Sequence, residues 1–388
     1  MANNVITKKD WVSNFTLIGE AKVTDYSFKI DAKSEKSNWI YNSLNLGIDC
    51  GEKHGVVYAE LMGGYSDAHE NVIYAHGKDD DGRDDFSKQI TVDWDDRFDD
   101  ELIEQIGDMC FITVGLEKTT AGKTYYKKFL SAYDAIAYVQ DNLDDGTVVN
   151  VKGRLKYSTY NDVVQVRKEI QSIVLSSVDD TSKYVARFTQ TILLDKESAS
   201  LKDIDKDKGV MYIRARVLDY VKEMNGVEIK GQYPFSFTFE FPMDFTNKEL
   251  CKKVLDKVFK VKKDVTQMTF DGVFIEGGAT VTATLDDVPD DIKELIDLGI
   301  YTEEEAIATC SSNGNRERRM MLKKPTVRLV GEDKTPVMQK FEQRYTEDDL
   351  FIDLGGDDED LPFGSTNSES DEDATTGDDD SMSWLEDL

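Results

Sequence analysis

The sequence predicts a mainly β protein in which two small β-barrels, with short helices and insertions, precede a disordered acidic tail. Three observations lead to this prediction. Segments with the two-residue period of a β-strand recur along most of the chain, and an order of three strands, one helix and two strands occurs twice. From Glu347 onward there are 17 Asp or Glu residues and no Lys or Arg. A chain of 388 residues has room for two such barrels and a tail.

The first predicted domain spans residues 1–178 and opens with antiparallel strands. Apolar and polar residues alternate in residues 11–31 and again in residues 39–62. An acidic insertion near residues 66–108 is rich in Gly and Asp, which is typical of a loop-rich excursion between strands. Further elements are then predicted in this order: strands at 111–117 and 125–131, and a helix at 134–143 with an apolar face.

Residues 146–175 have the most regular pattern, two strands joined at residues 159–162. In the first strand the valines and Gly153 share one parity, while Lys152, Arg154 and Lys156 share the other. In the second strand Arg167 takes the polar parity. We therefore expect a hairpin with a core face and a cationic face, edged by aromatic residues.

This hairpin resembles the closing strands of an OB-fold, the five-stranded barrel that binds oligonucleotides. The resemblance rests on Gly146, the alternating valines, Gly153 and a turn that contains Tyr160. A glycine within a strand usually marks a sharp bend or a close backbone approach, as a small barrel requires. A hairpin of a β-sandwich has the same pattern, so this segment alone leaves both folds open. The helix at 134–143 takes the place of the helix that an OB barrel has before its last strands.

The pattern repeats in the second predicted domain, residues 183–340, after a short linker. The strand at 227–244 places four phenylalanines on one parity, which favours a core face over a stacking platform. An insertion near residues 288–311 has the signals of a helical hairpin, since Gly299 can end one helix and Thr302 can cap the next. We therefore expect tandem OB-like domains.

The tail, residues 345–388, is too polar and too like-charged to form a core, so we expect it to be disordered. One of its two apolar islands resembles the acidic tip of bacterial single-stranded DNA-binding proteins, where acids precede an apolar residue, Pro and Phe. The resemblance implies a peptide that docks onto replication and repair enzymes. It assigns the acids and the anchor to Asp357, Asp358, Glu359, Asp360, Leu361, Pro362 and Phe363.

The second island lies further along the tail. In the bacterial family the tip is the chain terminus, whereas 25 residues follow Phe363 here. Residues 381–388 instead resemble the acidic tails, with an aromatic residue near the end, of phage single-stranded DNA-binding proteins. Candidate docking residues there are Trp384, Leu385 and Leu388. Either island is a candidate docking peptide for a polymerase, helicase or primase.

The formal net charge of −30 argues at first against a nucleic-acid partner. The charge is uneven, however, because the chain before Glu347 holds 47 basic and 60 acidic residues, a difference of −13. An acidic tail would compete with phosphates for the same basic side chains, which reconciles the charge with a DNA-binding body. Basic residues for phosphates and aromatic residues for bases are predicted at Tyr126, Lys127, Lys128, Lys152, Arg154, Lys156, Tyr157, Tyr160, Arg167, Arg214, Arg216, Arg318 and Arg319.

The sequence predicts no catalytic, metal or cofactor site. Its four cysteines are far apart and without a nearby histidine cluster, so we expect reduced structural thiols. Residues 115–124 lack the glycine spacing of a P-loop, and residues 79–86 lack that of an EF-hand. No nucleophile-elbow motif of serine hydrolases occurs.

Together these patterns predict a non-enzymatic, phage-type single-stranded DNA-binding protein that acts in DNA replication or recombination. Its partners would be single-stranded DNA and, through the tail, replication proteins. We expect a soluble, cytoplasmic protein, because no signal peptide or membrane span is found. A β-rich virion or assembly protein and a metal-dependent nuclease remain as alternatives. The sequence fixes neither the oligomeric state nor a preference for DNA over RNA.

Overall fold

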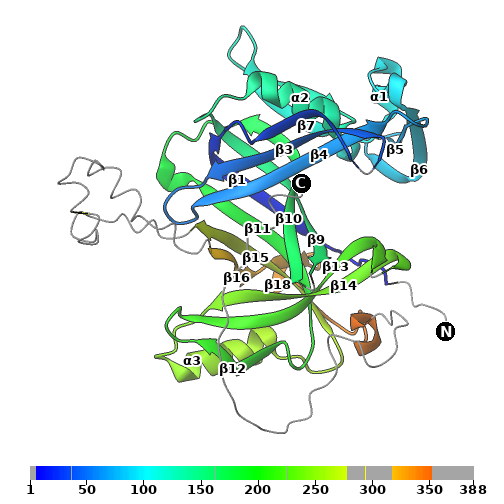
Figure 1. Ribbon diagram of the computed structural model, residues 1–388. Helices are drawn as coiled ribbons and strands as arrows, with labels where there is room; N and C mark the ends of the chain where they lie inside the picture. Colours follow the sequence, from blue (N-terminus) through cyan, green and yellow to red (C-terminus); the bar gives the residue numbers. More distant parts are fainter. Residues whose placement is uncertain are drawn as a thin grey trace. The chain divides into compact units, whose positions relative to one another are not determined.

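The computed structural model describes residues 6–35, 37–161, 163–224, 226–277, 293 and 317–351 (Figure 1). Within them the chain is mainly β, as predicted. The predicted helical hairpin near residues 288–311 and nearly all of the tail lie outside the described residues. The two barrels belong to one compact unit, Met1–Ile352. The predicted domain limits 1–178, 183–340 and 345–388 therefore stay predictions.

The first barrel is a closed cycle of five strands. Its strands are β1 (Ser13–Lys22), β3 (Trp39–Asp49), β4 (Val56–Ser66), β9 (Val148–Tyr160) and β10 (Val163–Leu175). Strand β1 pairs with β3 and β9, β3 with β4, and β9 with β10, all antiparallel. A parallel contact between β4 and β10 closes the cycle. This order is that of an OB-fold, which confirms the predicted fold class.

The core of this barrel comes from the alternating apolar residues that the sequence shows. Val149, Val151 and Leu155 are buried along β9, while Lys152 and Arg154 between them are exposed. Gly153 shares the buried parity, and a Cβ atom there would lie 1.9 Å from the carbonyl oxygen of Glu169. The β9–β10 register shifts next to this contact. The close approach explains why glycine stands at this position.

Several elements are inserted around the first barrel. They are β2 (Phe28–Lys33), β5 (Val72–Lys78), β6 (Asp84–Asp93), α1 (Asp100–Gln105), β7 (Ile112–Lys118), β8 (Thr124–Phe129) and α2 (Ala132–Asn142). Helix α2 is capped by Ser131 and packs against β3, β4 and β7. The acidic insertion, predicted as a loop, is instead a β5–β6 hairpin with a small core of Ala75, Val92, Ile106 and Phe111. The segment contains a short alternation of apolar and polar residues, but its many aspartates led to the prediction of a loop.

The second barrel repeats the same cycle. Its strands are β11 (Val185–Leu194), β13 (Val210–Met224), β14 (Val227–Pro242), β15 (Thr266–Gly277) and β16 (Glu317–Pro325). Strand β11 pairs with β13 and β15, β13 with β14, and β15 with β16, all antiparallel. A parallel pair of Glu240 and Met321 joins β14 to β16 and closes the cycle. Of the predicted phenylalanine row on β14, Phe235 and Phe239 are fully buried, as expected for a core face.

Smaller elements flank the second barrel. They are β12 (Ala199–Asp205), α3 (Lys248–Val254) continued by a π-turn (Leu255–Phe259), β17 (Val327–Val330), β18 (Thr335–Met338), β19 (Lys340–Glu342) and a 3₁₀ turn (Glu347–Leu350). Leu350 in this last turn is buried. The body of the protein therefore extends past residue 346, into what the sequence assigned to the tail.

The two barrels are joined edge to edge. Strand β1 pairs antiparallel with β11 over Ser13–Ile18, so one sheet continues from the first barrel into the second. Lys168 on β10 forms a buried ion pair with Glu276 on β15, at 2.5 Å. The ring of His54 is within 2.9 Å of the carbonyl oxygen of Phe274. Neither of these polar contacts was predicted from the sequence.

Candidate nucleic-acid interface

One row of side chains runs along the outer face of the first barrel and ends on β11, the first strand of the second barrel. Residues directly opposite one another in paired strands project from the same face. The registers of five successive strand pairs therefore align six residues, none of them buried. We call this set the cationic row, and from β8 to β11 it consists of Lys128, Thr113, Ser172, Lys152, Thr16 and Arg187.

The composition of the cationic row suits a phosphate backbone. Cations alternate with small hydroxyl side chains, and both are common phosphate ligands. Since neighbouring strands are about 4.8 Å apart, the three cations follow one another at roughly 10 to 15 Å. Arg154 lies two residues after Lys152 on the same face of β9, where the registers place it opposite Asn14 and Glu169.

The cations differ in whether a carboxylate already neutralises them. Lys128 is 3.0 Å from Asp108. Among the described residues, no carboxylate lies within ion-pair distance of Lys152, Arg154 or Arg187, and all three are exposed. These three side chains can therefore take phosphates without first losing a protein partner.

Two hollows flank the cationic row. The larger, of about 190 Å³, is lined by Arg154 and Gln171 together with Asp108, Met109 and Phe111. The smaller, of about 50 Å³, lies at the barrel junction and includes Asn14, Thr16 and Arg187. Each hollow thus has an unpaired arginine at its edge, next to apolar side chains.

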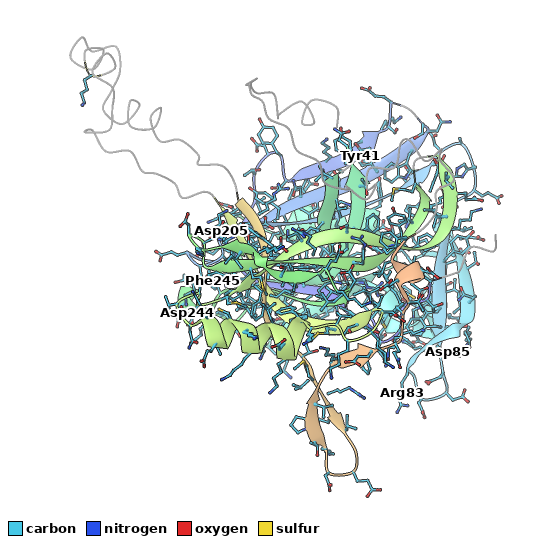
Figure 2. The ribbon with its side chains drawn as sticks, turned by 90° about the horizontal axis from the view of Figure 1, so that it is seen from below. Tyr41, Arg83, Asp85, Asp205, Asp244 and Phe245 are labelled. Atoms are coloured by element: carbon cyan, nitrogen blue, oxygen red, sulfur yellow. The ribbon has the colours of Figure 1, made fainter. Side chains whose placement is uncertain are left out.

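A second face of the first barrel has aromatic residues. In OB-folds the face of the second and third barrel strands commonly binds oligonucleotides, and here these strands are β3 and β4. Trp39 and Tyr41 stack with ring centroids 4.8 Å apart, and Tyr41 lies opposite Gly64. Tyr41 is labelled in Figure 2. Met62, on the same face, is 55% exposed. This face offers π-surfaces for stacking.

Eight of the nine predicted residues of the first domain fall into three groups. Lys152 and Arg154 are brought together with Lys128 on the outer face of the shared sheet. Tyr126 and Tyr160 are 57% and 54% exposed. The remaining cations have acidic partners: Lys127 with Glu117 at 3.5 Å, Arg167 with Glu60 at 3.4 Å, and Lys156 with Asp219 at 3.9 Å.

Tyr157 does not reach the surface, contrary to its predicted stacking role. It is 4% exposed and lies in the junction between the barrels. Its hydroxyl donates to Gln190 at 3.2 Å, its ring packs near Phe235 and Phe237, and its amide donates to Asp219. Burial raises the pKa of Tyr157 well above its ordinary value. The residue shares the parity of the core valines, so the strand period already favoured burial.

The predicted arginines of the second domain are mostly engaged. Arg214 pairs with Asp203, and Arg319 with Glu240 at 2.6 Å. The guanidinium of Arg216 lies 5.4 Å from the ring centre of Phe351. Arg318 is exposed on β16. Three of these four arginines therefore already contact other side chains of the protein.

The remaining predictions concern the tail, metal binding and membrane spans. All ten predicted docking residues of the tail lie outside the described residues. Within the described ranges, no group of three or more His, Cys, Asp or Glu could hold a metal ion. No helix in that part of the chain is long and apolar enough to cross a membrane.

Sequence reasoning missed Arg187, Trp39 and Tyr41. Arg187 is a single cation between Ala186 and Phe188, so no local charge cluster marks it. Its importance comes from the pairing of β11 with β1, which joins segments far apart in the chain. The signal for Trp39 and Tyr41 was present, because two aromatic residues share the polar parity of their strand.

The chain has similarities to a protein family and to solved structures. A family model described as YorF matches residues 78–270, just under half of the chain. No curated protein matches the sequence. Two similar solved structures are of the single-stranded DNA binding protein from Thermus aquaticus. A deletion mutant is 11% identical, with TM-score 0.31 and coverage of 71% of this chain and 89% of that chain. The wild type is 10% identical, with TM-score 0.31 and coverage of 69% and 86%. The fold assignment rests on the strand pairing of the chain itself.

Proposed function

We propose that this protein binds single-stranded DNA without catalysing a reaction. The observation that carries the proposal is the cationic row, together with Arg154. The row runs from the first OB-type barrel to the first strand of the second, and it contains cations with no carboxylate partner among the described residues. Sequence-tolerant binding of single strands combines such a basic track with aromatic faces. Trp39 and Tyr41 supply an aromatic face on the same barrel.

The further expectations concern the biological role. We propose that the protein acts in phage DNA replication or recombination and that its acidic tail recruits replication proteins. The tail would also compete with DNA for the cationic row at low salt, since both are polyanions. These expectations rest on the resemblance of the tail sequence and need their own tests.

The first experiment measures fluorescence anisotropy of a labelled oligo-dT strand. The full chain and a chain that ends after Phe351 are titrated at about 50 and 300 mM salt, because phosphate contacts are salt-sensitive. The cut after Phe351 keeps the buried Leu350 in place. We expect both chains to bind, more weakly at high salt, and the shortened chain to bind more tightly at low salt.

Alternative functions give different results in the same assay. If the protein is an assembly protein without a nucleic-acid site, neither the full chain nor the shortened chain would bind the oligonucleotide. Absence of binding at low salt would therefore overturn the proposal. A metal-dependent nuclease would shorten the strand after addition of magnesium, which gel electrophoresis of the same samples detects. A strand that stays intact supports binding without catalysis.

A further inference from the structure

The larger hollow lies on one flank of the cationic row. Its lining residues Phe111, Gln171 and Arg154 come two residues before, one residue before and two residues after the row positions in β7, β10 and β9, respectively. Strand β7 runs parallel to β10, and β9 runs antiparallel to it, so all three displacements point the same way. Two residues along a strand correspond to about 7 Å. A nucleic-acid backbone that follows the row therefore passes close beside the hollow.

A β-bulge supplies one polar side chain of the hollow. The register of β10 with β9 shifts between Ile170 and Ser172, so Gln171 has no partner residue on β9. Ile170 and Ile173 are buried, whereas the two residues between them are partly exposed, so the bulge turns two successive side chains outward. No other described residue forms a hydrogen bond with the side-chain amide of Gln171. Both its donor and its acceptor are therefore available to a ligand.

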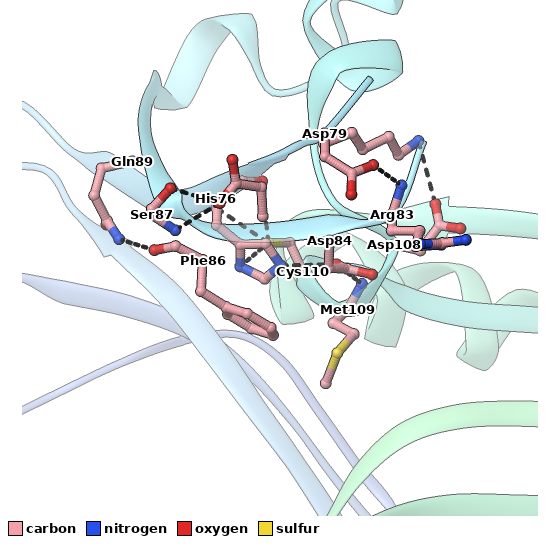
Figure 3. A network of polar contacts seen from close by, with 12 residues as sticks. His76, Asp79, Arg83, Asp84, Phe86, Ser87, Gln89, Asp108, Met109 and Cys110 are labelled. Carbon is pink, nitrogen blue, oxygen red and sulfur yellow. Dashed lines mark hydrogen bonds and ion pairs between the residues drawn. The ribbon is translucent and has the colours of Figure 1, made fainter. Parts of the chain in front are cut away.

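A hydrogen-bonded network of the β5–β6 hairpin holds the apolar wall of the hollow in place, as Figure 3 shows for Met109, Asp84 and His76. The amide N–H of Met109 donates to Oδ1 of Asp84 at 2.9 Å, and this bond is the main cause that lowers the pKa of Asp84 from its ordinary value. The same oxygen is 2.7 Å from Nε2 of His76. Phe111 is 6% exposed, in the core of the hairpin, whereas Met109 is 51% exposed. The Met109 thioether is thus fixed where it can contact a flat ring.

Asp108 lines the hollow without making it anionic. Lys78 and Lys128 lie 3.3 and 3.0 Å from its Oδ1, so two ammonium groups offset its charge. The hydrogen bond from Lys128 is the main cause that holds the pKa of Asp108 below its ordinary value. A carboxylate has roughly four acceptor positions, so capacity for a further donor remains. Arg154 has no carboxylate partner among the described residues and can hold a phosphate at the edge of the hollow.

These features define the kind of group that the hollow can hold. Its volume of about 190 Å³ is below the roughly 300 to 1,000 Å³ of pockets for drug-sized molecules, so the occupant is one small group. Phe111 and Met109 offer an apolar wall to a flat ring. Gln171 and Asp108 offer hydrogen-bonding groups to the edge of that ring, and Arg154 offers a cation to an attached phosphate. A nucleobase on its sugar-phosphate backbone matches all of these groups.

We propose that the larger hollow is a subsite for one nucleobase of a bound single strand, with adenine as the preferred base. The amide of Gln171 can pair with N6 and N7 of adenine, as glutamine does when it distinguishes adenine in DNA. The second hydrogen of N6 can be donated to Asp108. Guanine would place its O6 acceptor against these same acceptors, and pyrimidines have no N7. The base subsite rests on the proposed function, since it needs a strand bound along the cationic row.

The test compares four labelled oligonucleotides that differ at one position, with the full chain and anisotropy as the readout. Each is an oligo-dT strand of the shortest length that the protein still binds, with dT, dA, dG or dC at its centre. A short strand allows few binding registers, so the registers that place the central base in the hollow contribute strongly to the measured affinity. We expect the strand with dA to bind about fivefold or more tightly than the other three, the discrimination of one bidentate base contact.

Two variants separate a base contact from a phosphate contact. Gln171→Leu should abolish the preference for dA. It should leave the salt dependence of oligo-dT binding unchanged, because a neutral side chain releases no counterions from the strand. The matched control is Gln165→Leu, at an exposed glutamine of the same strand that does not line the hollow, and it should keep the preference. Retained binding of oligo-dT shows that each variant is folded.

The outcomes distinguish the base subsite from the proposed function. Equal affinities for the four strands, a preference for another base, or a preference for dA that survives Gln171→Leu would overturn the base subsite. In each of these cases, salt-dependent binding of oligo-dT would still support the proposed function. Absence of binding to all four strands would overturn the proposed function, and the base subsite with it.

Discussion

Replacing the unpaired cations of the shared outer face should reduce the salt dependence of DNA binding by a calculable amount. The change is the triple substitution Lys152→Ala, Arg154→Ala and Arg187→Ala. For single strands, each neutralised phosphate contributes about 0.7 to the slope of log affinity against log salt. If each of the three cations holds one phosphate, the slope should become shallower by about 2. Between about 50 and 300 mM salt, the affinity of the triple variant should then fall about 40-fold less than that of the wild type.

The assay is the oligo-dT anisotropy titration at four or more salt concentrations, with slopes compared rather than single affinities. A matched control replaces three exposed cations elsewhere, Arg83, Lys183 and Lys196, each in a surface ion pair. Figure 2 shows Arg83, which lies in the turn of the β5–β6 hairpin. The control triple should keep the wild-type slope. Equal slopes for both triples and the wild type would refute the assignment of phosphates to this face.

Three further predictions test the remaining features. Trp39→Ala should weaken oligo-dT binding by about 1 to 3 kcal/mol with an unchanged salt slope, if a base stacks there, and the same titrations measure both quantities. Lys168→Met should lower the free energy of unfolding by about 3 to 5 kcal/mol, since Glu276 is left buried without a partner, while Lys168→Met with Glu276→Leu should recover most of it in chemical denaturation. Burial raises the pKa of Cys50 from 9.0 to about 12, so the unfolded chain loses this proton first as pH rises. The free energy of unfolding should therefore fall above about pH 9, and less so for Cys50→Ala, whose denaturation curves at several pH values give the comparison.

The strand period and a few special residues were enough to predict the fold class. Along β9 the alternation of valines with Lys152 and Arg154 fixed which side faces the core, and Gly153 indicated the close approach that the barrel requires. The strand period does not explain Lys168. This residue has the parity of the core side chains and is nevertheless charged. Its partner Glu276 is 108 residues away, so no local pattern could have revealed the pair.

The candidate interface was predictable only where neighbouring residues of one strand mark it, as they do for Lys128 on β8 and for Lys152 and Arg154 on β9. Lys152 and Arg154 could be chosen because adjacent residues of one strand reveal its cationic face. Arg187 could not, because its place beside them depends on the pairing of β1 with both β9 and β11.

The barrel junction links the fold to the proposed function. Strand β9 presents Lys152 and Arg154 outward, while Tyr157, an inward residue of the same strand, is hydrogen-bonded to Gln190 on β11 and Asp219 on β13. These bonds hold the cations of β9 in a set register with Arg187, which is also on β11. Because the backbone of both strands is already fixed, binding a nucleic acid would order only the side chains. Tyr157 is therefore not available for stacking on a base. Its buried contacts instead position the cations of the candidate interface.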